Sequence, residues 1–349
     1  MPPFIMTIVG ARPQFVKAAV VSRALRARGR VAETIVHTGQ HFDDNMSGAF
    51  FRDLDIPTPA HNLDIHGGTH GQMTGRMLEG LEELMLARKP ALVLVYGDTN
   101  STLAGALAAA KLHVPVAHVE AGLRSFNRRM PEEVNRVMVD HLSALLFCPT
   151  ATSVANLSRE GVAEGVHFVG DVMYDATLHA REVAEARSDA LQRLGLTPGR
   201  YALCTLHRSE NTDDPARLQE LLDHVEDAAR NVEVIMPVHP RTQAVLQRAG
   251  LATGRLRLIE PLTYFDMHRL LASASLVLTD SGGLQKEAYF HRVPCVTLRE
   301  ETEWVETVGA GWNRLWRTPL WSTPRKEIAD YGSGEAGRRI AEALEVFIS

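Results

Sequence analysis

The chain has 349 residues, 45% hydrophobic and 23% charged, with a net charge of −5, which excludes disordered, collagen-like and coiled-coil classes. The acidic balance argues against a general nucleic-acid binder, which would present a basic face. Three cysteines stand far apart in or beside apolar runs, so we expect buried thiols and no disulfide framework. No apolar run reaches the length of a membrane span and the amino terminus lacks a basic segment, which predicts a soluble cytoplasmic protein without a membrane partner.

The first half of the chain alternates apolar strands with helices. Strands are predicted over residues 4–9, 34–37, 91–96 and 116–119. The glycine-rich residues 66–75 are expected to form a functional loop without regular structure. Continuous apolar strands between helices are typical of a parallel sheet buried on both faces. Ligands bind such sheets at the carboxyl ends of the strands, where four polar residues fall: Arg12, Gln40, Asp98 and Glu120.

Residues 116–136 join a buried strand to a helix through an arginine-rich loop that carries Arg124. Pro131 and the acidic residue Glu132 suit the first turn of that helix. The apolar stripe of the helix is spaced at helical period and runs through Val134, Val137, Met138 and Leu142. Glu120 and Glu132 either meet across the loop or serve as a strand-end acid and a surface ion pair.

The strand–helix pattern restarts after Asp171, so we predict domains of 1–170 and 171–349. The order of elements along the sequence leaves open whether the last helix, around 334–347, packs back on the N-terminal domain. Strands of the second domain are predicted over residues 201–206, 232–238, 275–279 and 294–298. Loops with His207, Arg208 and His239 follow the first two of these strands.

Residues 280–287 follow a strand and open a helix, and two glycines there let backbone N–H groups approach an anion. Ser281 adds a hydroxyl, and Glu287 lies one turn in, where it can accept from ribose hydroxyls. Arg12 and Lys17 share the first strand–turn–helix unit, so a diphosphate clamped between two domains is the functional interpretation. A plain N-cap with a glycine turn is the alternative.

Asp98, Glu120 and His207 each follow an apolar strand, as groups for proton transfer at a sugar carbon would. Alternatively, Asp98 caps a helix and His207 is a structural histidine, the interpretation that we prefer for His118. We predict no metal site, because His37 and His41 do not share a helix face. We also predict no dinucleotide cofactor, because the first turn lacks the Gly-x-Gly-x-x-Gly fingerprint.

Six ordered motifs resemble the non-hydrolysing UDP-N-acetylglucosamine 2-epimerase family: Gly-Ala-Arg-Pro-Gln-Phe-Val-Lys17, Tyr-Gly-Asp98-Thr-Asn-Ser, His-Val-Glu120-Ala-Gly-Leu-Arg, Pro-Glu132-Glu-Val-Asn-Arg, His207-Arg-Ser-Glu-Asn and Asp-Ser281-Gly-Gly-Leu-Gln-Lys-Glu287. The resemblance implies a glycosyltransferase-B fold, an α/β class with two Rossmann-like domains facing across a cleft. It implies a catalytic set of Asp98, Glu120, Glu132 and His207. The predicted groups for UDP and the sugar are Arg12, Lys17, Gln40, Arg124, Arg208, His239, Ser281, Gly282, Gly283 and Glu287.

Two departures from the family bear on the substrate. Trp304 stands where many members have the arginine of Thr-Glu-Arg-Pro-Glu, and Thr69-His-Gly-Gln72 stands where regulated bacterial members have an Arg-Gln pair. The Gly-Gly-Thr-His-Gly loop and Trp-Val-Glu are similar to relatives that epimerise UDP-2,3-diacetamido-2,3-dideoxyglucuronate.

We therefore predict a cofactor-independent isomerase that converts UDP-GlcNAc reversibly to UDP-ManNAc for cell-envelope polysaccharide synthesis, by elimination of UDP to a 2-acetamidoglycal and re-addition. The first alternative is a 2-epimerase of the diacetamidoglucuronate. A hydrolysing 2-epimerase, a glycosyltransferase on the same fold and a sugar-nucleotide-binding regulator without turnover are less favoured. A homodimer is expected.

Overall fold

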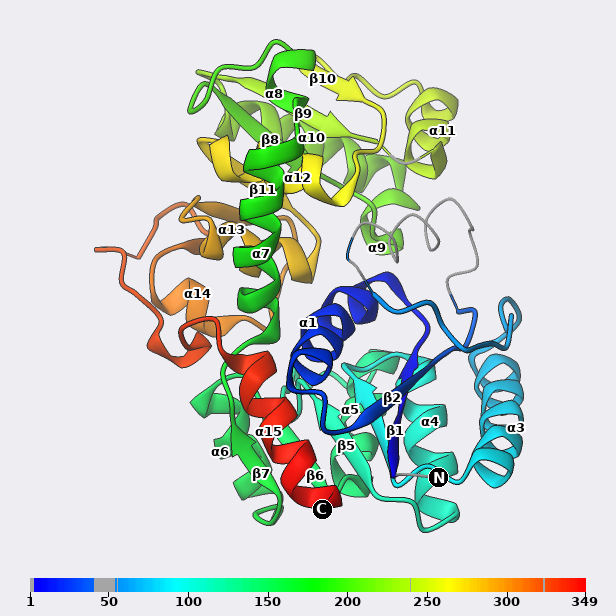
Figure 1. The fold of residues 1–349 in the computed structure, drawn as a ribbon. Helices are drawn as coiled ribbons and strands as arrows, with labels where there is room; N and C mark the ends of the chain where they lie inside the picture. The colour runs from blue at the N-terminus through cyan, green and yellow to red at the C-terminus, as the bar shows by residue number, and fades with distance from the viewer. Residues whose placement is uncertain (1–2, 41–53, 55, 239, 323) are drawn as a thin grey trace. The chain divides into compact units, whose positions relative to one another are not determined.

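The computed structural model describes residues 3–40, 54, 56–238, 240–322 and 324–349, and the chain divides into two compact units. The first comprises residues 1–176 and 329–349, and the second comprises residues 177–328. Each is built on one parallel sheet with helices (Figure 1). We placed the domain boundary at residue 170, whereas the division falls inside helix α7 (Val172–Arg187). The last helix belongs to the first unit.

The sheet of the first unit has seven strands in the order β3-β2-β1-β4-β5-β6-β7, and the paired strands are parallel. Its strands are β1 (Phe4–Val9), β2 (Ala32–His37), β3 (His61–Asn62), β4 (Leu92–Tyr96), β5 (Val116–Val119), β6 (Leu145–Cys148) and β7 (Val166–Phe168). Its helices besides α7 are α1 (Arg12–Arg28), α3 (His70–Arg88), α4 (Asn100–Lys111), α5 (Pro131–Leu142), α6 (Ala151–Arg159) and α15 (Ala336–Ile348).

The sheet of the second unit has six strands in the order β10-β9-β8-β11-β12-β13, again with parallel pairs. Its strands are β8 (Tyr201–Thr205), β9 (Glu233–Pro237), β10 (Leu256–Ile259), β11 (Leu276–Thr279), β12 (Cys295–Thr297) and β13 (Asn313–Leu315). Its helices are α8 (Ala190–Arg193), α9 (Ser209–Thr212), α10 (Pro215–Ala228), α11 (Pro240–Ala249), α12 (Tyr264–Ser273), α13 (Gly282–Phe290) and α14 (Val305–Gly309).

Both strand orders reverse at one pair of neighbouring strands, which are β1 and β4 in the first unit and β8 and β11 in the second. Ligands of doubly wound sheets bind at such switch points. The turns after these four strands carry Arg12, Asp98, His207 and Ser281. The strand order thus places predicted site residues of each unit at its own switch point.

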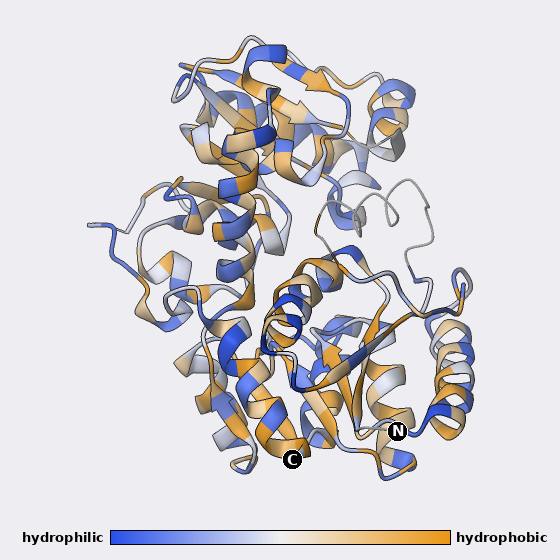
Figure 2. Ribbon diagram, in the orientation of Figure 1, coloured by the Kyte–Doolittle hydropathy of each residue, from blue (hydrophilic) through white to orange (hydrophobic). Residues whose placement is uncertain are grey.

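The central strands are buried on both faces, as the continuous apolar runs predicted. All five residues of β4 and all four of β5 and β6 are buried. Figure 2 shows the hydrophobic residues gathered along the strands of each sheet. Five short strands, of two to four residues each, were not predicted from the sequence: β3, β6, β7, β10 and β13. Across the part of the chain that the structure describes, no helix combines the length and apolarity needed to cross a membrane.

The prediction of an irregular loop over residues 66–75 is wrong for its second half, because α3 begins at His70. A capping box starts the helix despite the neighbouring glycines. The Thr69 hydroxyl accepts from the amide of Gln72 at 3.3 Å, and the Gln72 side chain accepts from the amide of Thr69 at 3.0 Å. These bonds satisfy donors that every helix start leaves unpaired.

Helix α5 buries its polar face and exposes part of its apolar stripe. Val134 and Met138 of that stripe are each 42% exposed, whereas Glu133, Arg136 and Asp140 are buried. The stripe in the sequence is real, but it does not mark the buried side of this helix. The buried polar side chains pair with loops at the sheet edge, and these pairs offset the cost of burying them.

The C-terminal helix α15 is fastened to α1 in the first unit. Gly337 lies against Val20, where an added Cβ would come within 2.5 Å of Val20 Cγ1 and 3.3 Å of its carbonyl oxygen. Asp175 accepts from the amides of Ala336 and Gly337 at the start of α15, at 3.2 and 2.9 Å. Arg28 adds a bond of 2.8 Å to Glu345.

We expect Gly337→Ala to lower the free energy of unfolding by roughly 1–3 kcal/mol, because the new methyl group overpacks the contact with α1. Gly75→Ala is the matched control, since Gly75 lies in the exposed interior of α3 and an added Cβ there meets nothing within 4 Å. That change should be neutral or stabilise by about 0.5–1 kcal/mol through helix propensity. Urea denaturation measures both, and equal effects would contradict a tight α1–α15 contact.

Candidate functional site

In the first unit, Asp98 and Glu120 lie at the carboxyl ends of the neighbouring strands β4 and β5. Gly97, just before Asp98, has a φ of 59°. A Cβ there would lie 3.4 Å from Glu120 Oε2 and 3.4 Å from Lys17 Nζ, so both groups lie against this turn. Two carboxylates from adjacent turns thus come together, as the strand ends predicted.

Glu120 is held in an uncommon backbone conformation and in a buried ion pair. Its φ of 73° lies in the left-handed region, which non-glycine residues rarely adopt. Its amide and that of Ala121 both donate to the carbonyl of Phe147 at 3.1 Å. Lys17 from α1 pairs with its carboxylate, and both side chains are less than a tenth exposed. Strained backbone held by its surroundings is typical of functional positions.

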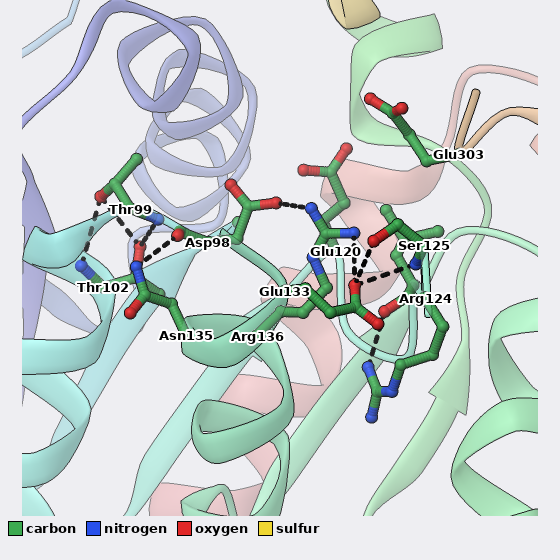
Figure 3. Close-up of polar contacts among 12 residues, drawn as sticks. Asp98, Thr99, Thr102, Glu120, Arg124, Ser125, Glu133, Asn135, Arg136 and Glu303 are labelled. Carbon is green, nitrogen blue, oxygen red and sulfur yellow. Dashed lines mark hydrogen bonds and ion pairs between the residues drawn. The ribbon is translucent and has the colours of Figure 1, made fainter. Parts of the chain in front are cut away.

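Arg136 from α5 lies between two carboxylates and pairs with Asp98 and with Glu133, the latter at 3.2 Å (Figure 3). Burial raises the pKa of the Asp98 carboxyl, and the charge of Glu120 also raises it. The charges of Arg136 and Lys17 offset only part of this rise. A carboxyl group with a raised pKa is suited to exchange protons near neutral pH.

Asp98 does not cap α4, the alternative that its sequence context allowed. Thr99 is the N-cap, and its hydroxyl accepts from the amide of Thr102. Asn135 of α5 donates to the Asp98 carbonyl at 2.9 Å and thereby holds the backbone of this turn. The Asp98 carboxylate instead forms an ion pair with Arg136.

Gln14 is a residue that the sequence analysis missed. Its amide nitrogen donates to the carbonyl of Tyr96 and to the Thr102 hydroxyl, both at 2.8 Å. Its oxygen accepts from the amides of Gly10 and Ala11 at 2.8 and 3.0 Å. One buried amide therefore joins the turn after β1, which carries Arg12, to the end of β4. Its place at the N3 position of α1, where capping-box side chains sit, was the available signal.

Gln40 is the predicted substrate residue of the second strand. Its side-chain oxygen accepts from the amide and the hydroxyl of Ser101 at 3.2 and 2.7 Å. The Ser101 hydroxyl also lies 2.8 Å from that of Thr38. Gln40 is thus fastened to the start of α4, one turn from Asp98.

The structure does not bring Glu132 or Arg124 into the position that we predicted. Glu132 is exposed on α5, and its neighbour Glu133 is the buried carboxylate that pairs with Arg136. Helix period decides this, since adjacent residues face about 100° apart and only one can point inward. The Arg124 guanidinium is buried and donates to Asp140 and in two bonds to Glu160, each at 2.7 Å. These bonds tie the loop after β5 to α5 and α6, and a contact of Arg124 with substrate stays a prediction.

In the second unit, Asp280 at the end of β11 organises the turn after β8. Its carboxylate accepts from the amides of His207 and Arg208 at 3.1 and 3.0 Å and from the Asn211 side chain at 3.2 Å. It lies 3.2 Å from His207 Nδ1, and that ring is half exposed. Although burial alone would raise the pKa of Asp280, its bonds to His207, Arg208 and Asn211 hold it below the usual value. His239 lies outside the described residues.

Helix α13 begins with the predicted anion-binding turn. Ser281 is its N-cap and accepts from the amide of Leu284 at 3.4 Å. Gly282 meets a close neighbour, since a Cβ there would lie 2.5 Å from Glu303 Oε1. Gly283 leaves open space on its side. One turn further on, Glu287 lies 3.8 Å from Nε2 of the buried His268.

Glu303, which the sequence analysis did not single out, places a carboxylate against the start of α13. Burial alone would raise the pKa of Glu303, but the charges of Arg299 and Arg208 and its own backbone amide hold it below the usual value. Arg299 donates to it at 2.9 Å. An internal carboxylate at a helix N-terminus indicates that this turn accommodates negative charge.

Trp304, the departure from the family motif, covers a buried cation. Lys286 Nζ lies 3.7 Å from the centroid of the indole ring, and the two residues are 1% and 5% exposed. An ammonium group over a tryptophan face is a favourable cation–π pair. The indole therefore stacks on a lysine of α13, where an arginine would place a second positive charge.

Comparison with known proteins gives one consistent family. A family model described as UDP-N-acetylglucosamine 2-epimerase matches residues 23–345. A UDP-2,3-diacetamido-2,3-dideoxy-D-glucuronate 2-epimerase from Pseudomonas aeruginosa is 52% identical, with 97% of this chain and 99% of the relative covered. A UDP-N-acetylglucosamine 2-epimerase from Methanocaldococcus jannaschii is 40% identical, with 97% of each chain covered.

A solved structure agrees. The crystal structure of the Methanocaldococcus jannaschii UDP-GlcNAc 2-epimerase in complex with UDP-GlcNAc and UDP matches with a TM-score of 0.87, covering 98% of this chain and 99% of that one. The predicted fold class, an α/β protein with two Rossmann-like units of the glycosyltransferase-B type, is confirmed.

We expect Lys17→Met to lower the free energy of unfolding by about 3–5 kcal/mol, because it leaves the Glu120 carboxylate buried without its ammonium partner. The double variant Lys17→Met, Glu120→Gln should lose less than the sum of the two single changes, since no buried charge is then unpaired. Lys111→Met, at the exposed end of α4, is the control and should change little. Strictly additive effects in chemical denaturation would contradict the pairing.

Proposed function

Because this chain belongs to the UDP-N-acetylglucosamine 2-epimerase family, we propose that it inverts C2 of a UDP-linked 2-acetamido sugar. The observation that carries the proposal is the pair of carboxylates at the switch-point edge of the first sheet, Asp98 beside Arg136 and Glu120 beside Lys17. Inversion at carbon needs a group to remove a proton from one face and a group to deliver one to the other. Two carboxylates with different cation partners supply such a pair.

The C2 proton of such a sugar is not next to a carbonyl, so its direct removal would leave an unstabilised carbanion. In the proposed mechanism, a carboxylate takes the C2 proton while the C1–O bond to UDP breaks, and a C1–C2 double bond forms. The glycal then gains a proton at C2 from the opposite face, and UDP forms the C1–O bond again. Atoms and charge balance without an oxidant or reductant.

The leaving diphosphate needs preorganised donors. We assign this role to the start of α13, because a helix start with Ser281, Gly282 and Gly283 offers backbone N–H groups to an anion. A role of Arg12 at the phosphates stays a prediction. His207, which is oriented by Asp280, binds the phosphate or takes part in a proton transfer. Glu287 binds the ribose. Independence of a cofactor, assembly as a homodimer and a cytoplasmic location stay predictions.

We propose UDP-2,3-diacetamido-2,3-dideoxy-D-glucuronate as the substrate, the first alternative of the sequence analysis. The 52% identity to the Pseudomonas aeruginosa enzyme of that name supports this choice, as does Trp304 in place of the arginine of many relatives. UDP-GlcNAc, the sugar that we first predicted, is the second candidate. The 40% identical Methanocaldococcus jannaschii enzyme, solved with UDP-GlcNAc and UDP, supports it.

The test is to incubate the protein with each sugar nucleotide in deuterated water and to follow C2 by NMR. We expect inversion of the diacetamidoglucuronate, deuterium at C2 of the product and small amounts of glycal and free UDP. Asp98→Asn and Glu120→Gln should each slow turnover by on the order of 10²-fold or more. Product that keeps its original C2 hydrogen would rule out the mechanism, and turnover of UDP-GlcNAc alone would reverse the choice of substrate.

The raised pKa of Asp98 gives a pH dependence with a definite sign. A carboxyl group with a raised pKa takes up its proton at a higher pH than a normal aspartate does. As the pH falls, Asp98 therefore loses its negative charge, and with it the ability to accept a proton, at a higher pH than a normal aspartate would. Arg136→Met removes a charge that favours ionised Asp98 and should move the acid limb of kcat/KM to higher pH. Arg129→Met, an exposed arginine of the same region, is the control. A limb that stays in place in Arg136→Met would refute this role of Asp98.

A further inference from the structure

We propose that His118 is a positioning residue for the proposed epimerisation and sets the geometry of both turns that present Asp98 and Glu120. The inference rests on the proposed function. From the sequence alone we prefer a structural role for this histidine, and the structure places it inside strand β5. The contacts of its ring give that role a specific consequence for the site.

The ring of His118 is fully buried and has a partner at each nitrogen. Nε2 lies 2.7 Å from the carbonyl oxygen of Gly97, in the peptide that joins Gly97 to Asp98. Nδ1 lies 2.7 Å from Oδ1 of Asp140, which is also buried. One imidazole thus joins the turn after β4 to helix α5.

Asp140 extends the connection to the turn that follows Glu120. Its Oδ2 accepts from the amide of Gly122 at 3.1 Å and from Arg124 at 2.7 Å. Gly122 has a φ of 78°, and a Cβ there would lie 2.4 Å from the carbonyl oxygen of Ser153, so this turn has no room to shift. The same ring therefore holds the peptide before Asp98 and, through one carboxylate, the backbone two residues beyond Glu120.

Both partners of the His118 ring are hydrogen-bond acceptors. A carbonyl oxygen only accepts, and an ionised carboxylate only accepts. Although burial alone would raise the pKa of Asp140, the hydrogen bond and charge of His118 and the charge of Arg124 hold it below its usual value, so the carboxylate is ionised. Each ring nitrogen therefore faces an oxygen that accepts a hydrogen bond.

A neutral side chain of similar size cannot replace this ring. Phenylalanine fills the volume but leaves the Gly97 carbonyl and one Asp140 oxygen without a donor. Glutamine offers an amide donor to one partner, while its oxygen would face the other acceptor. Because Glu120 already adopts a left-handed φ, its turn depends on surrounding bonds to keep its carboxylate in place. A displacement of about 1 Å in a reacting group is enough to cost about 10²-fold in rate.

The experiment compares His118→Phe and His118→Gln with His167→Phe. His167 is the matched control, because its ring lies on strand β7 of the same sheet and packs on Phe147 with ring centroids 5.6 Å apart. It makes neither of the contacts that His118 makes to Gly97 and Asp140. For His118→Phe we expect kcat to fall at least about 10²-fold with KM within about threefold of wild type, because the groups assigned to UDP lie on other elements. His118→Gln should lie between, and His167→Phe should match the wild type.

Two further measurements separate positioning from loss of the fold and from failure of the proposed function. Calorimetric titration with UDP should give the same affinity for His118→Phe and the wild type if His118→Phe is folded. If His118→Phe does not fold, the same comparison is made with His118→Gln. In ¹⁵N-histidine spectra of the wild type, one buried ring should carry protons on both nitrogens, and that signal should vanish in His118→Phe. A wild type that epimerises neither sugar nucleotide would defeat the proposed function, whereas the spectrum still tests the ring. A kcat equal to that of His167→Phe, or a ring with one protonated nitrogen, would overturn the inference.

Discussion

Buried charges that must be paired govern the first unit. Lys17 with Glu120, Arg136 with Asp98 and Glu133, and Arg124 with Asp140 and Glu160 all lie around the carboxyl ends of β4 and β5. An ion moved from water into protein loses solvation that only a well-placed partner restores. The loops and α5 therefore adopt the arrangement that satisfies every one of these groups. Such a network holds the two carboxylates in set positions and gives them different surroundings.

The second unit has the same sheet architecture as the first but carries different groups at its switch point. Its sheet also reverses strand order between two parallel strands, β8 and β11. At that point the Asp280 carboxylate accepts hydrogen bonds from the amides after β8, and helix α13 begins. Helix starts carry partial positive charge and unpaired N–H groups, which suits a phosphate. Glu303 and Arg299 show how the protein itself places charge there. The first unit thus gathers carboxylates at its switch point, and the second presents a helix start there.

The sequence determined the α/β class, the central strands and the strand-end carboxylates. Continuous apolar runs that alternate with helices are typical of strands buried on both faces, and polar residues directly after parallel strands lie at one edge of the sheet. The strand ends placed Asp98 and Glu120 at that edge, whereas only the structure shows that Thr99, and not Asp98, caps α4. The short strands β3, β7 and β13 at the sheet edges lay below what periodicity detects.

Which side chains around those strand ends point inward depends on contacts that the chain makes only when it is folded. The apolar stripe of α5 suggested the wrong buried face, because paired charges offset the burial of Glu133, Arg136 and Asp140 while Val134 and Met138 stayed exposed. Arg124 pairs with Asp140 and Glu160, and Glu132 is exposed to solvent. His118 acquired its role through Gly97 and Asp140, residues 21 and 22 positions away in the chain. Local sequence records which groups are polar, but whether a buried polar group is satisfied depends on partners that only folding brings together.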